Sequence, residues 1–133
     1  LRSAEAAGAD AVAFTRGSVD VFNPKVVRSS AGALFAVPVV VYVDLSEVAE
    51  CCRTAAAPIR LLGTSSHNGE AYDTVDLASP VALAVGNEAQ GLDATAPVDG
   101  WVTIPHRGRA ESLNVAMAAT VLVFEAARQR ARR

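Results

Sequence analysis

Apolar positions along the 133-residue chain fall into short runs that alternate with stretches of helical character. Runs of this length, bounded by polar or turn-forming residues, are typical of strands, and they cover residues 11–14, 39–43, 59–63, 81–85 and 101–104. Because strands alternate with helices, the pattern predicts an α/β fold with a mostly parallel sheet flanked by helices, in one domain over residues 1–133.

Helical stretches lie before, between and after the predicted strands. Asn23 followed by Pro24 is a strong helix start, because the Asn side chain caps the first turn and proline is tolerated at the first helical position. Gly8 ends the first helix, and Pro58 stops the third. The predicted helices cover residues 2–7, 23–35, 44–56 and 112–130.

Two apolar segments depart from the usual alternation with polar residues. The run "VALAV" (81–85) has no polar position, which predicts a strand that is buried on both faces of a parallel sheet. Residues 115–124 are apolar except for Thr120, whereas a helix on the surface of a monomer should show a polar face. We expect one side of this helix to pack on the sheet and the other to meet a second copy in a homodimer.

Composition and charge narrow the choice of partners. The chain is 51% hydrophobic and 20% charged, which is ordinary for a globular protein, and no apolar run reaches the length of a membrane span. We therefore expect no membrane partner. The net charge of -2 argues weakly against nucleic acid, and no DNA partner is expected, but residues 106–109 and 128–133 are locally basic.

The cysteines and histidines do not predict a metal site. Cys51 and Cys52 are adjacent, whereas structural metal sites need spaced ligands, and His67 and His106 stand alone in the sequence. The simpler interpretation is two free thiols in a reducing cytosol, which agrees with a cytoplasmic location.

Three loops that follow predicted strands are the candidate functional segments. They are "GTSSHNG" (63–69), "GNEAQGL" (86–92) and "IPHRGRAESLN" (104–114), and ligands of open α/β sheets collect beyond the carboxyl ends of the strands. Each loop also has a purely structural interpretation. Gly86 and Gly91 fit turn positions, and Ser112 fits the N-cap of the last helix.

Common nucleotide-binding and hydrolase motifs are missing. "GNEAQG" does not fit G-x-G-x-x-G, and a P-loop is excluded because the only lysine is Lys25. The G-x-S-x-G elbow of serine hydrolases is also absent. A carboxylate inside the loop would repel phosphate, so the loop at 86–92 predicts another kind of ligand.

Taken together, three segments carry a family resemblance. "RSAEAAGADAV", "VALAVGNEAQGL" and "IPHRGRAESLNVAMAATVLVFEAAR" occur in the order of motifs 1, 2 and 3 of the SpoU (TrmH-type) RNA 2′-O-ribose methyltransferases of the SPOUT superfamily, which they resemble. In that family an Asn and a Gly normally precede the motif 1 arginine, whereas here Leu1 directly precedes Arg2. We therefore expect the N-terminal part of the domain, and any upstream RNA-binding domain, to lie outside residues 1–133.

The resemblance implies a fold, a cofactor and partners. The fold is the SPOUT fold with a C-terminal trefoil knot, the cofactor is S-adenosyl-L-methionine, and the partners are RNA and a second copy of the chain. The sulfonium cation of S-adenosyl-L-methionine explains why a carboxylate is tolerable in the loop at 86–92. The glycines of that loop let its backbone approach the cofactor. Residues expected to bind the cofactor are Leu62, Gly63, Thr64, Gly86, Asn87, Gly91, Ile104, Pro105 and Leu113, with Ile104 and Leu113 as apolar walls for the adenine.

The resemblance also implies catalytic roles for Arg2, Glu88, Ser112 and Asn114. Ser112 and Asn114 lie at the start of the last helix, where they would orient the target ribose or its phosphate. Arg2 matches the family's catalytic arginine, which lies near the dimer interface and is associated with the partner's cofactor. Because the pKa of an arginine exceeds about 12, two roles stay open: stabilising the alkoxide by charge, or acting as a base with help from the substrate phosphate.

Several functions remain to be separated. The sequence between the first two motifs resembles the branch that modifies 23S ribosomal RNA, and transfer RNA is the alternative substrate. A catalytically silent RNA-binding relative is a second alternative, because the upstream Asn is missing, and a generic α/β nucleotide-binding module is a third. Binding of S-adenosylmethionine distinguishes a generic nucleotide-binding module from the other candidates. Methyl transfer to RNA then distinguishes an enzyme from a silent relative.

Overall fold

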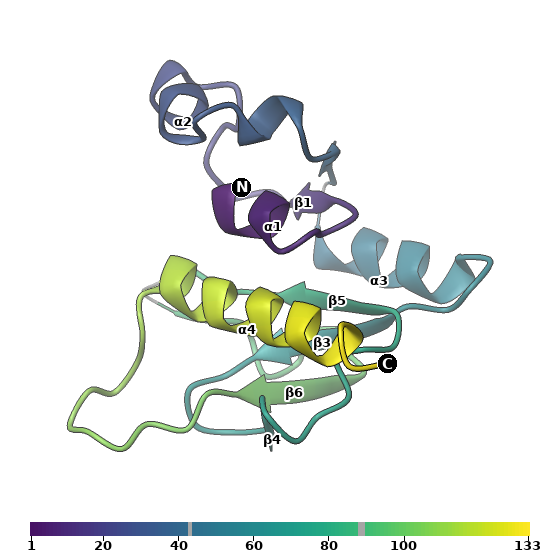
Figure 1. The fold of residues 1–133 in the computed structure, drawn as a ribbon, viewed down its shortest axis with the longest axis vertical. Helices are drawn as coiled ribbons and strands as arrows, with labels where there is room; N and C mark the ends of the chain where they lie inside the picture. The colour runs from purple at the N-terminus through teal and green to yellow at the C-terminus, as the bar shows by residue number, and fades with distance from the viewer. Residues whose placement is uncertain (43, 88–89) are drawn as a thin grey trace.

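The computed structural model describes residues 1–42, 44–87 and 90–133 (Figure 1). Its helices are α1 (Arg2–Ala6), α2 (Pro24–Ser29), the 3₁₀ helix η1 (Ala33–Phe35), α3 (Leu45–Thr54) and α4 (Val115–Arg130). Its strands are β1 (Val12–Phe14), β2 (Val39–Val41), β3 (Arg60–Thr64), β4 (Glu70–Ala71), β5 (Val81–Ala84) and β6 (Gly100–Thr103).

The strands form two separate sheets in which every pair is parallel. β1 pairs with β2, and the larger sheet has the order β4-β6-β3-β5. Helix α4 lies across one face of the larger sheet (Figure 1). The predicted α/β class with parallel strands flanked by helices is therefore confirmed. The trefoil knot concerns how the chain threads through its own loops, and it stays a prediction.

The hydrophobic core lies between the larger sheet and α4. Leu77 and Leu122 are almost completely inaccessible to solvent, at 0% and 1% exposure. The core cluster consists of Leu62, Val75, Leu77, Val102, Leu122 and Ala126. Two faces of α4 are thus distinguished: one carries Leu122 and Ala126 into the core, and the other is left exposed.

A polar clamp fastens the end of α4 to the segment that precedes β5. The side chain of Gln129 donates to the carbonyl of Val75 at 3.1 Å and accepts from the amide of Leu77 at 2.9 Å. Buried Glu125 accepts from Arg128 Nε at 2.7 Å and from Gln129 Nε2 at 2.9 Å. Mainly because of Arg128, the pKa of Glu125 falls to about 2.

Two predicted segments differ from the structure. The helix predicted over 23–35 is interrupted after α2, because Ala31 and Gly32 have positive φ values of 49° and 90°, which an α-helix does not accommodate. As predicted, the Asn23 side chain caps α2 by accepting from the amide of Lys25. No strand was predicted between residues 63 and 81, but directly after the loop at 63–69 the chain forms the short strand β4, which pairs with β6.

The prediction that "VALAV" is buried on both faces is wrong for this structure. All four residues of β5 are only half-buried, and Val85 is 40% exposed. The cause is the position of β5 at one end of the larger sheet, where it has a strand neighbour on one side among the described residues.

The remaining sequence expectations concern thiols, metals and membranes. Cys51 is exposed and Cys52 is buried, both are free, and burial raises the pKa of the Cys52 thiol. Over the part of the chain that the structure describes, no three His, Cys, Asp or Glu side chains gather as a metal site would require. Within that same part, no helix combines the length and apolar character needed to cross a bilayer.

Candidate functional site

The three candidate loops leave the larger sheet at the same edge. Gly63 of β3 is aligned with Ala84 of β5, and Thr64 is aligned with Val102 of β6. Because β3, β5 and β6 are parallel, their carboxyl ends and the loops that follow them converge. The structure thus brings the predicted cofactor-binding segments together.

The loop after β5 is a tight turn that Asn87 closes. The Asn87 side chain accepts from the amide of Gln90 at 2.7 Å, and its carbonyl accepts from the amide of Gly91 at 2.9 Å. Gly91 has a φ of 67°, which favours glycine. A Cβ on Gly86 would collide with the backbone of Gly91 and Leu92, so the two arms of the turn touch at that point. The predicted catalytic residue Glu88 lies outside the described residues.

At the end of β3, backbone and small side chains face the shared edge. Leu62 as a whole residue is only 3% exposed and packs in the core, so it offers a ligand little surface. Gly63 is buried, and a Cβ there would lie 2.8 Å from the Trp101 ring. Packing against Trp101 therefore explains this glycine without a cofactor. Thr64 is half-buried at the strand end.

The loop after β6 combines an anchored start with an exposed remainder. Ile104 packs against the core cluster, whereas Pro105 is exposed and Leu113 is 40% exposed. The Nε2 atom of His106 is buried without a hydrogen-bond partner among the described residues. Buried polar atoms normally have a partner, so His106 is a candidate that sequence reasoning passed over. Its only sequence signal was its place between Pro105 and a basic stretch.

Asn114, not Ser112, caps the last helix. The Asn114 side chain accepts from the amides of Ala116 at 2.9 Å and Met117 at 3.3 Å. The interpretation of Ser112 as the N-cap is therefore wrong, and the predicted helix over 112–130 begins instead at Val115. Ser112 is exposed just ahead of the positive end of α4, where an anion or a ribose hydroxyl is favoured.

Arg2 lies on a different element from the three loops. It is the first residue of α1, it is exposed, and its side chain makes no hydrogen bond or ion pair with another described residue. Helix α1 packs against α4, where the Ser3 and Thr120 hydroxyl oxygens are 2.7 Å apart. The structure thus holds the Arg2 helix on α4 and leaves its guanidinium group available.

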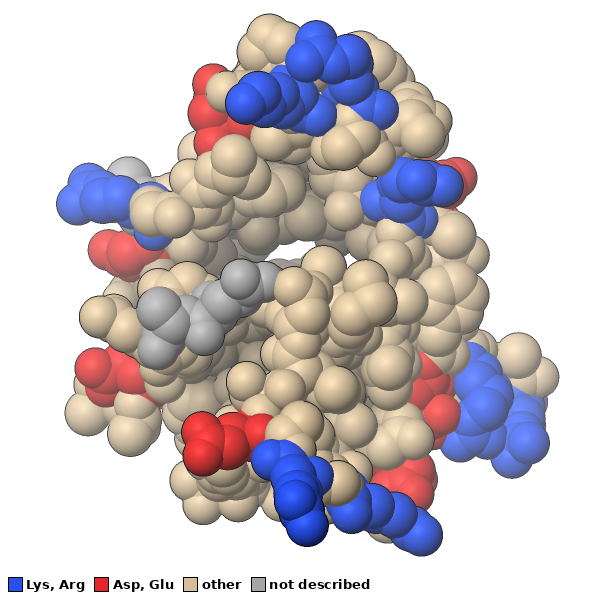
Figure 2. Space-filling model, turned by 90° about the vertical axis from the view of Figure 1, so that its left-hand side faces the viewer, with Lys and Arg blue, Asp and Glu red and all other residues tan. Residues whose placement is uncertain are grey.

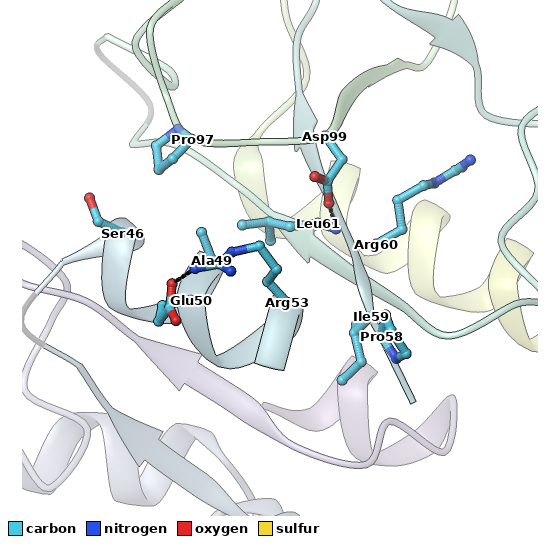
Figure 3. A pocket seen from close by; sticks show the side chains of 10 residues that line it. All are labelled: Ser46, Ala49, Glu50, Arg53, Pro58, Ile59, Arg60, Leu61, Pro97 and Asp99. Carbon is cyan, nitrogen blue, oxygen red and sulfur yellow. Dashed lines mark hydrogen bonds and ion pairs between the residues drawn. The ribbon is translucent and has the colours of Figure 1, made fainter. Parts of the chain in front are cut away.

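A concave region lies at the edge of the larger sheet opposite the three loops. This pocket of about 590 Å³ is formed by α3 and the segments leading into β3 and β6 (Figure 3). Two pairs of its polar groups bind one another: the amide of Leu61 donates to Asp99 Oδ2 at 2.7 Å, and Arg53 pairs with Glu50. None of the residues predicted from the sequence lines it.

Charged side chains are scattered over the face drawn in Figure 2. Basic and acidic groups alternate around its outline, and no single basic band crosses it. On this face, electrostatic attraction for RNA is therefore local and does not follow a continuous track.

Comparison with known proteins gives a consistent result over nearly the whole chain. A family model described as the SpoU rRNA Methylase family matches residues 1–124. A 23S rRNA (uridine(2479)-2'-O)-methyltransferase from Streptomyces viridochromogenes is 42% identical over 135 residues, which cover 98% of this chain and 47% of that protein. The 23S rRNA (guanosine(2553)-2'-O)-methyltransferase RlmP from Bacillus subtilis is 41% identical and covers 93% of this chain and 50% of that protein.

A solved structure agrees with the sequence relatives. The crystal structure of the SpoU methyltransferase AviRb from Streptomyces viridochromogenes, in complex with the cofactor AdoMet, matches with a TM-score of 0.89 at 41% identity. The match covers 99% of this chain and 54% of that one. The chain therefore spans about half the length of the curated relatives it matches.

Proposed function

Because the chain belongs to the SpoU rRNA Methylase family, we propose that it forms the catalytic domain of an S-adenosylmethionine-dependent enzyme that methylates a ribose 2′-hydroxyl of 23S ribosomal RNA. The observation that carries the proposal is the convergence of the loops at 62–64, 86–92 and 104–114 at one edge of the sheet. The loops at 86–92 and 104–114 belong to the segments that resemble motifs 2 and 3 of the family, and the matches to relatives named as 23S rRNA methyltransferases cover 98% and 93% of this chain.

The residues present at this edge fit a methionine-derived nucleoside. The backbone of Gly91 and Leu92 fills the space that a side chain at Gly86 would take, so the turn stays narrow at this edge. Ile104 offers an apolar surface for an adenine ring, and the partnerless Nε2 atom of His106 offers a polar contact in the same loop. We assign the cofactor to these residues together with Leu62, Gly63, Thr64, Asn87, Gly91, Pro105 and Leu113.

The proposed reaction joins a ribose oxygen to a methyl carbon. When bound, S-adenosylmethionine supplies an electrophilic methyl group on a sulfonium sulfur; as the ribose oxygen bonds to that carbon, the carbon–sulfur bond breaks and the sulfur becomes a neutral thioether. The 2′-hydroxyl must also lose its proton. Ser112, ahead of the positive end of α4, would hold the ribose or its phosphate, and Asn114 fixes where that helix begins.

Arg2 is the residue we propose to act on the developing alkoxide. Its guanidinium group makes no ion pair with a described residue, so its charge is available to an RNA phosphate or an oxyanion. Both roles considered above, electrostatic stabilisation and phosphate-assisted proton removal, are compatible with this position. Glu88 keeps its proposed place in the loop after β5.

A homodimer is the proposed assembly. Met117, Val121 and Phe124 are 58%, 37% and 47% exposed, and their spacing of four and three residues places them on one face of α4. A second copy would cover this apolar face. If the family association between the motif 1 arginine and the partner's cofactor applies here, the same interface would complete the site.

The test is methyl transfer to defined RNA. The enzyme, produced with its natural flanking sequence, is incubated with 23S ribosomal RNA, transfer RNA and methyl-labelled S-adenosylmethionine, and 2′-O-methyl positions are mapped. Label at one ribose of 23S RNA supports the proposal. Label in transfer RNA alone would make transfer RNA the substrate in place of 23S RNA, and cofactor binding without methyl transfer to any RNA indicates a silent relative.

The proposed location of the protein is the cytoplasm, because that is where a protein that works on ribosomal RNA meets its substrate.

A further inference from the structure

Exposed aromatic residues flank α2 on both sides in the chain. Phe22 and Phe35 are 68% and 82% exposed, and no other large hydrophobic residue that the structure describes is as exposed as either. Both belong to residues 15–42, the segment that follows β1 and contains α2, η1 and β2. A single exposed hydrophobic residue is ordinary on a protein surface, whereas two aromatic residues in one segment indicate an interaction surface.

A hydrogen-bonded turn fixes the backbone that carries Phe22. The amide of Phe22 donates to Asp20 Oδ1 at 3.0 Å, and the amide of Asn23 donates to the Asp20 carbonyl at 3.0 Å. A hydrophobic residue just before an N-cap often packs against the fourth residue of the helix, here Val27, but the exposure of Phe22 shows that most of this residue is not used in that way. A partner would therefore meet Phe22 on an ordered backbone, which lowers the entropic cost of binding.

The same segment is positively charged, although the whole chain has a net charge of -2. Arg16, Lys25 and Arg28 are exposed, and their side chains make no hydrogen bond or ion pair with a described residue. Lys25 and Arg28 are three positions apart on α2, which places them side by side on the helix. The one carboxylate in residues 15–42 is Asp20, which accepts from the backbone.

The position of this segment relates it to the candidate site. In Figure 1, β1, β5 and β6 point toward the side of the molecule on which α2 lies, and Figure 2 shows Lys and Arg side chains at the α2 end. The 3₁₀ helix η1, which follows α2, packs against α1. Since α1 begins at Arg2, the segment is held beside the helix that carries the proposed catalytic arginine.

We propose that Phe22, Lys25, Arg28 and Phe35 form a surface, the α2 surface, that binds single-stranded RNA next to the target ribose. The two rings stack on bases, and the two cations contact phosphates. Aromatic side chains combined with unpaired cations are the chemistry by which proteins hold unpaired RNA. This inference rests on the proposed function in one respect, namely that the substrate is RNA.

Charge favours RNA over a second copy of the chain as the occupant. In an isologous contact through the α2 surface, Lys25 and Arg28 of both copies would lie close together, and like charges repel. RNA carries the opposite charge along its whole backbone. The face of α4 that carries Met117, Val121 and Phe124 is also apolar, and it offers a second copy a contact without this repulsion.

Fluorescence anisotropy with a labelled oligouridine tests the proposal on the natural protein with its flanking sequence, without S-adenosylmethionine. Phe22→Leu and Phe35→Leu should each weaken binding about fivefold or more and leave its salt dependence unchanged, because stacking is lost and no charge is removed. The double variant Lys25→Gln/Arg28→Gln should lower the slope of log affinity against log salt by about 1.4, since each phosphate contact to a single strand contributes about 0.7. Unchanged affinity in both leucine variants, or an unchanged slope in the double variant, would overturn the proposal.

Controls separate the α2 surface from general effects. Arg53→Gln removes an exposed cation of α3 that pairs with Glu50, and it should change neither affinity nor slope. Phe22→Trp keeps a stacking ring and should bind at least as tightly as the original protein. If Phe22→Leu instead changes the oligomeric state in sedimentation velocity, a second copy covers this surface and the proposal is wrong. Because the cofactor is omitted, weaker binding in the variants supports the α2 surface even if no RNA is methylated.

Discussion

Ser3 and Thr120 are 117 positions apart in the chain, yet their hydroxyl oxygens lie 2.7 Å from one another. Thr120 Oγ1 also lies 2.7 Å from the carbonyl of Ala116 and donates its single proton there. Ser3 must therefore be the donor in the bond to Thr120. This bond connects the helix that carries Arg2 to the helix that Asn114 caps, and so joins the two sets of proposed catalytic residues.

Replacing Thr120 should separate the contribution of this bond from that of packing. Thr120→Val keeps the shape of the side chain but leaves the Ser3 hydroxyl without its acceptor, so the free energy of unfolding should fall by about 1 kcal/mol. Thr120→Ser keeps both hydrogen bonds and should be nearly neutral. Urea denaturation measures both; a Thr120→Val protein as stable as the original would show that the bond contributes nothing.

Arg2→Ala should impair chemistry far more than cofactor binding. The guanidinium group is exposed on α1 and outside the three loops assigned to the cofactor, so cofactor affinity should stay within a few-fold. Loss of one charge that stabilises the alkoxide should slow single-turnover methyl transfer by about 10² or more. Arg2→Lys, which keeps the charge without the bidentate fork, should fall in between. Normal turnover by Arg2→Ala would remove Arg2 from the mechanism.

Gly86→Ala should open the turn after β5 and weaken cofactor binding. The added methyl group would collide with the backbone of Gly91 and Leu92, so the arms must separate. Overpacking on this scale should lower cofactor affinity about tenfold or more in calorimetry. Gly108→Ala is the matched control, because a Cβ there meets nothing within 4 Å. Equal affinities for the two variants, at unchanged melting temperatures, would exclude the turn from the cofactor site.

Phe124→Asp should convert the proposed dimer into a monomer. The change places a charge on the exposed apolar face of α4, and burying an unpaired carboxylate in an interface is costly. Arg130→Asp, at an exposed position near the end of the same helix, should leave the dimer intact. Sedimentation velocity distinguishes the two. A Phe124→Asp protein that still sediments as a dimer would place the interface elsewhere.

Glu125 should make stability depend on pH in the acid range. Its pKa is lowered from 4.5 to about 2, chiefly by Arg128, so the ionised form stabilises the fold fully above pH 4.5 and progressively less as pH falls toward 2. Glu125→Gln should be less stable than the original at pH 7, and this difference should shrink toward pH 2. Urea denaturation between pH 7 and 2 measures it.

Subtracting the stability of Glu125→Gln from that of the original protein at each pH cancels the contributions of other carboxylates. The pKa of Asp76 is likewise lowered to about 2, chiefly by hydrogen bonding to Ser79, and it titrates equally in both proteins. Glu111→Gln alters an exposed carboxylate with no ion pair among the described residues, and it should follow the original protein at every pH. A pH-independent difference for Glu125→Gln would contradict the role of its charge.

Local signals in the sequence were sufficient for most elements, because each depends on neighbouring residues. Asn23 and Pro24 start α2, and Asp44 caps α3 through the amides of Ser46 and Glu47. Features that depend on distant contacts were not predictable in this way. The edge position of β5 is such a feature, since it depends on which strands are its neighbours. The positive φ of Ala31, an uncommon conformation for alanine, also broke a predicted helix.

In the candidate site, too, some features depend on neighbouring residues and others on distant contacts. Strand-end loops converge because parallel strands end together, so Gly86 and Ile104 could be grouped from the sequence. The cap function of Asn114 and the isolated Nε2 atom of His106 could not, since both depend on where side chains pack. Gly63 shows the reverse case, in which a glycine assigned to ligand approach is required by the Trp101 ring.

The position of β6 has a consequence for synthesis. This strand lies between β3 and β4, both of which leave the ribosome before it. Until residue 103 has emerged, β3 and β4 cannot be joined, because β6, which pairs with both, has not been made. The core is also incomplete until Leu122 of α4 has emerged. Translation of the last third of the chain is therefore the earliest time at which the larger sheet closes, and pauses before that point prolong exposure of its apolar strands.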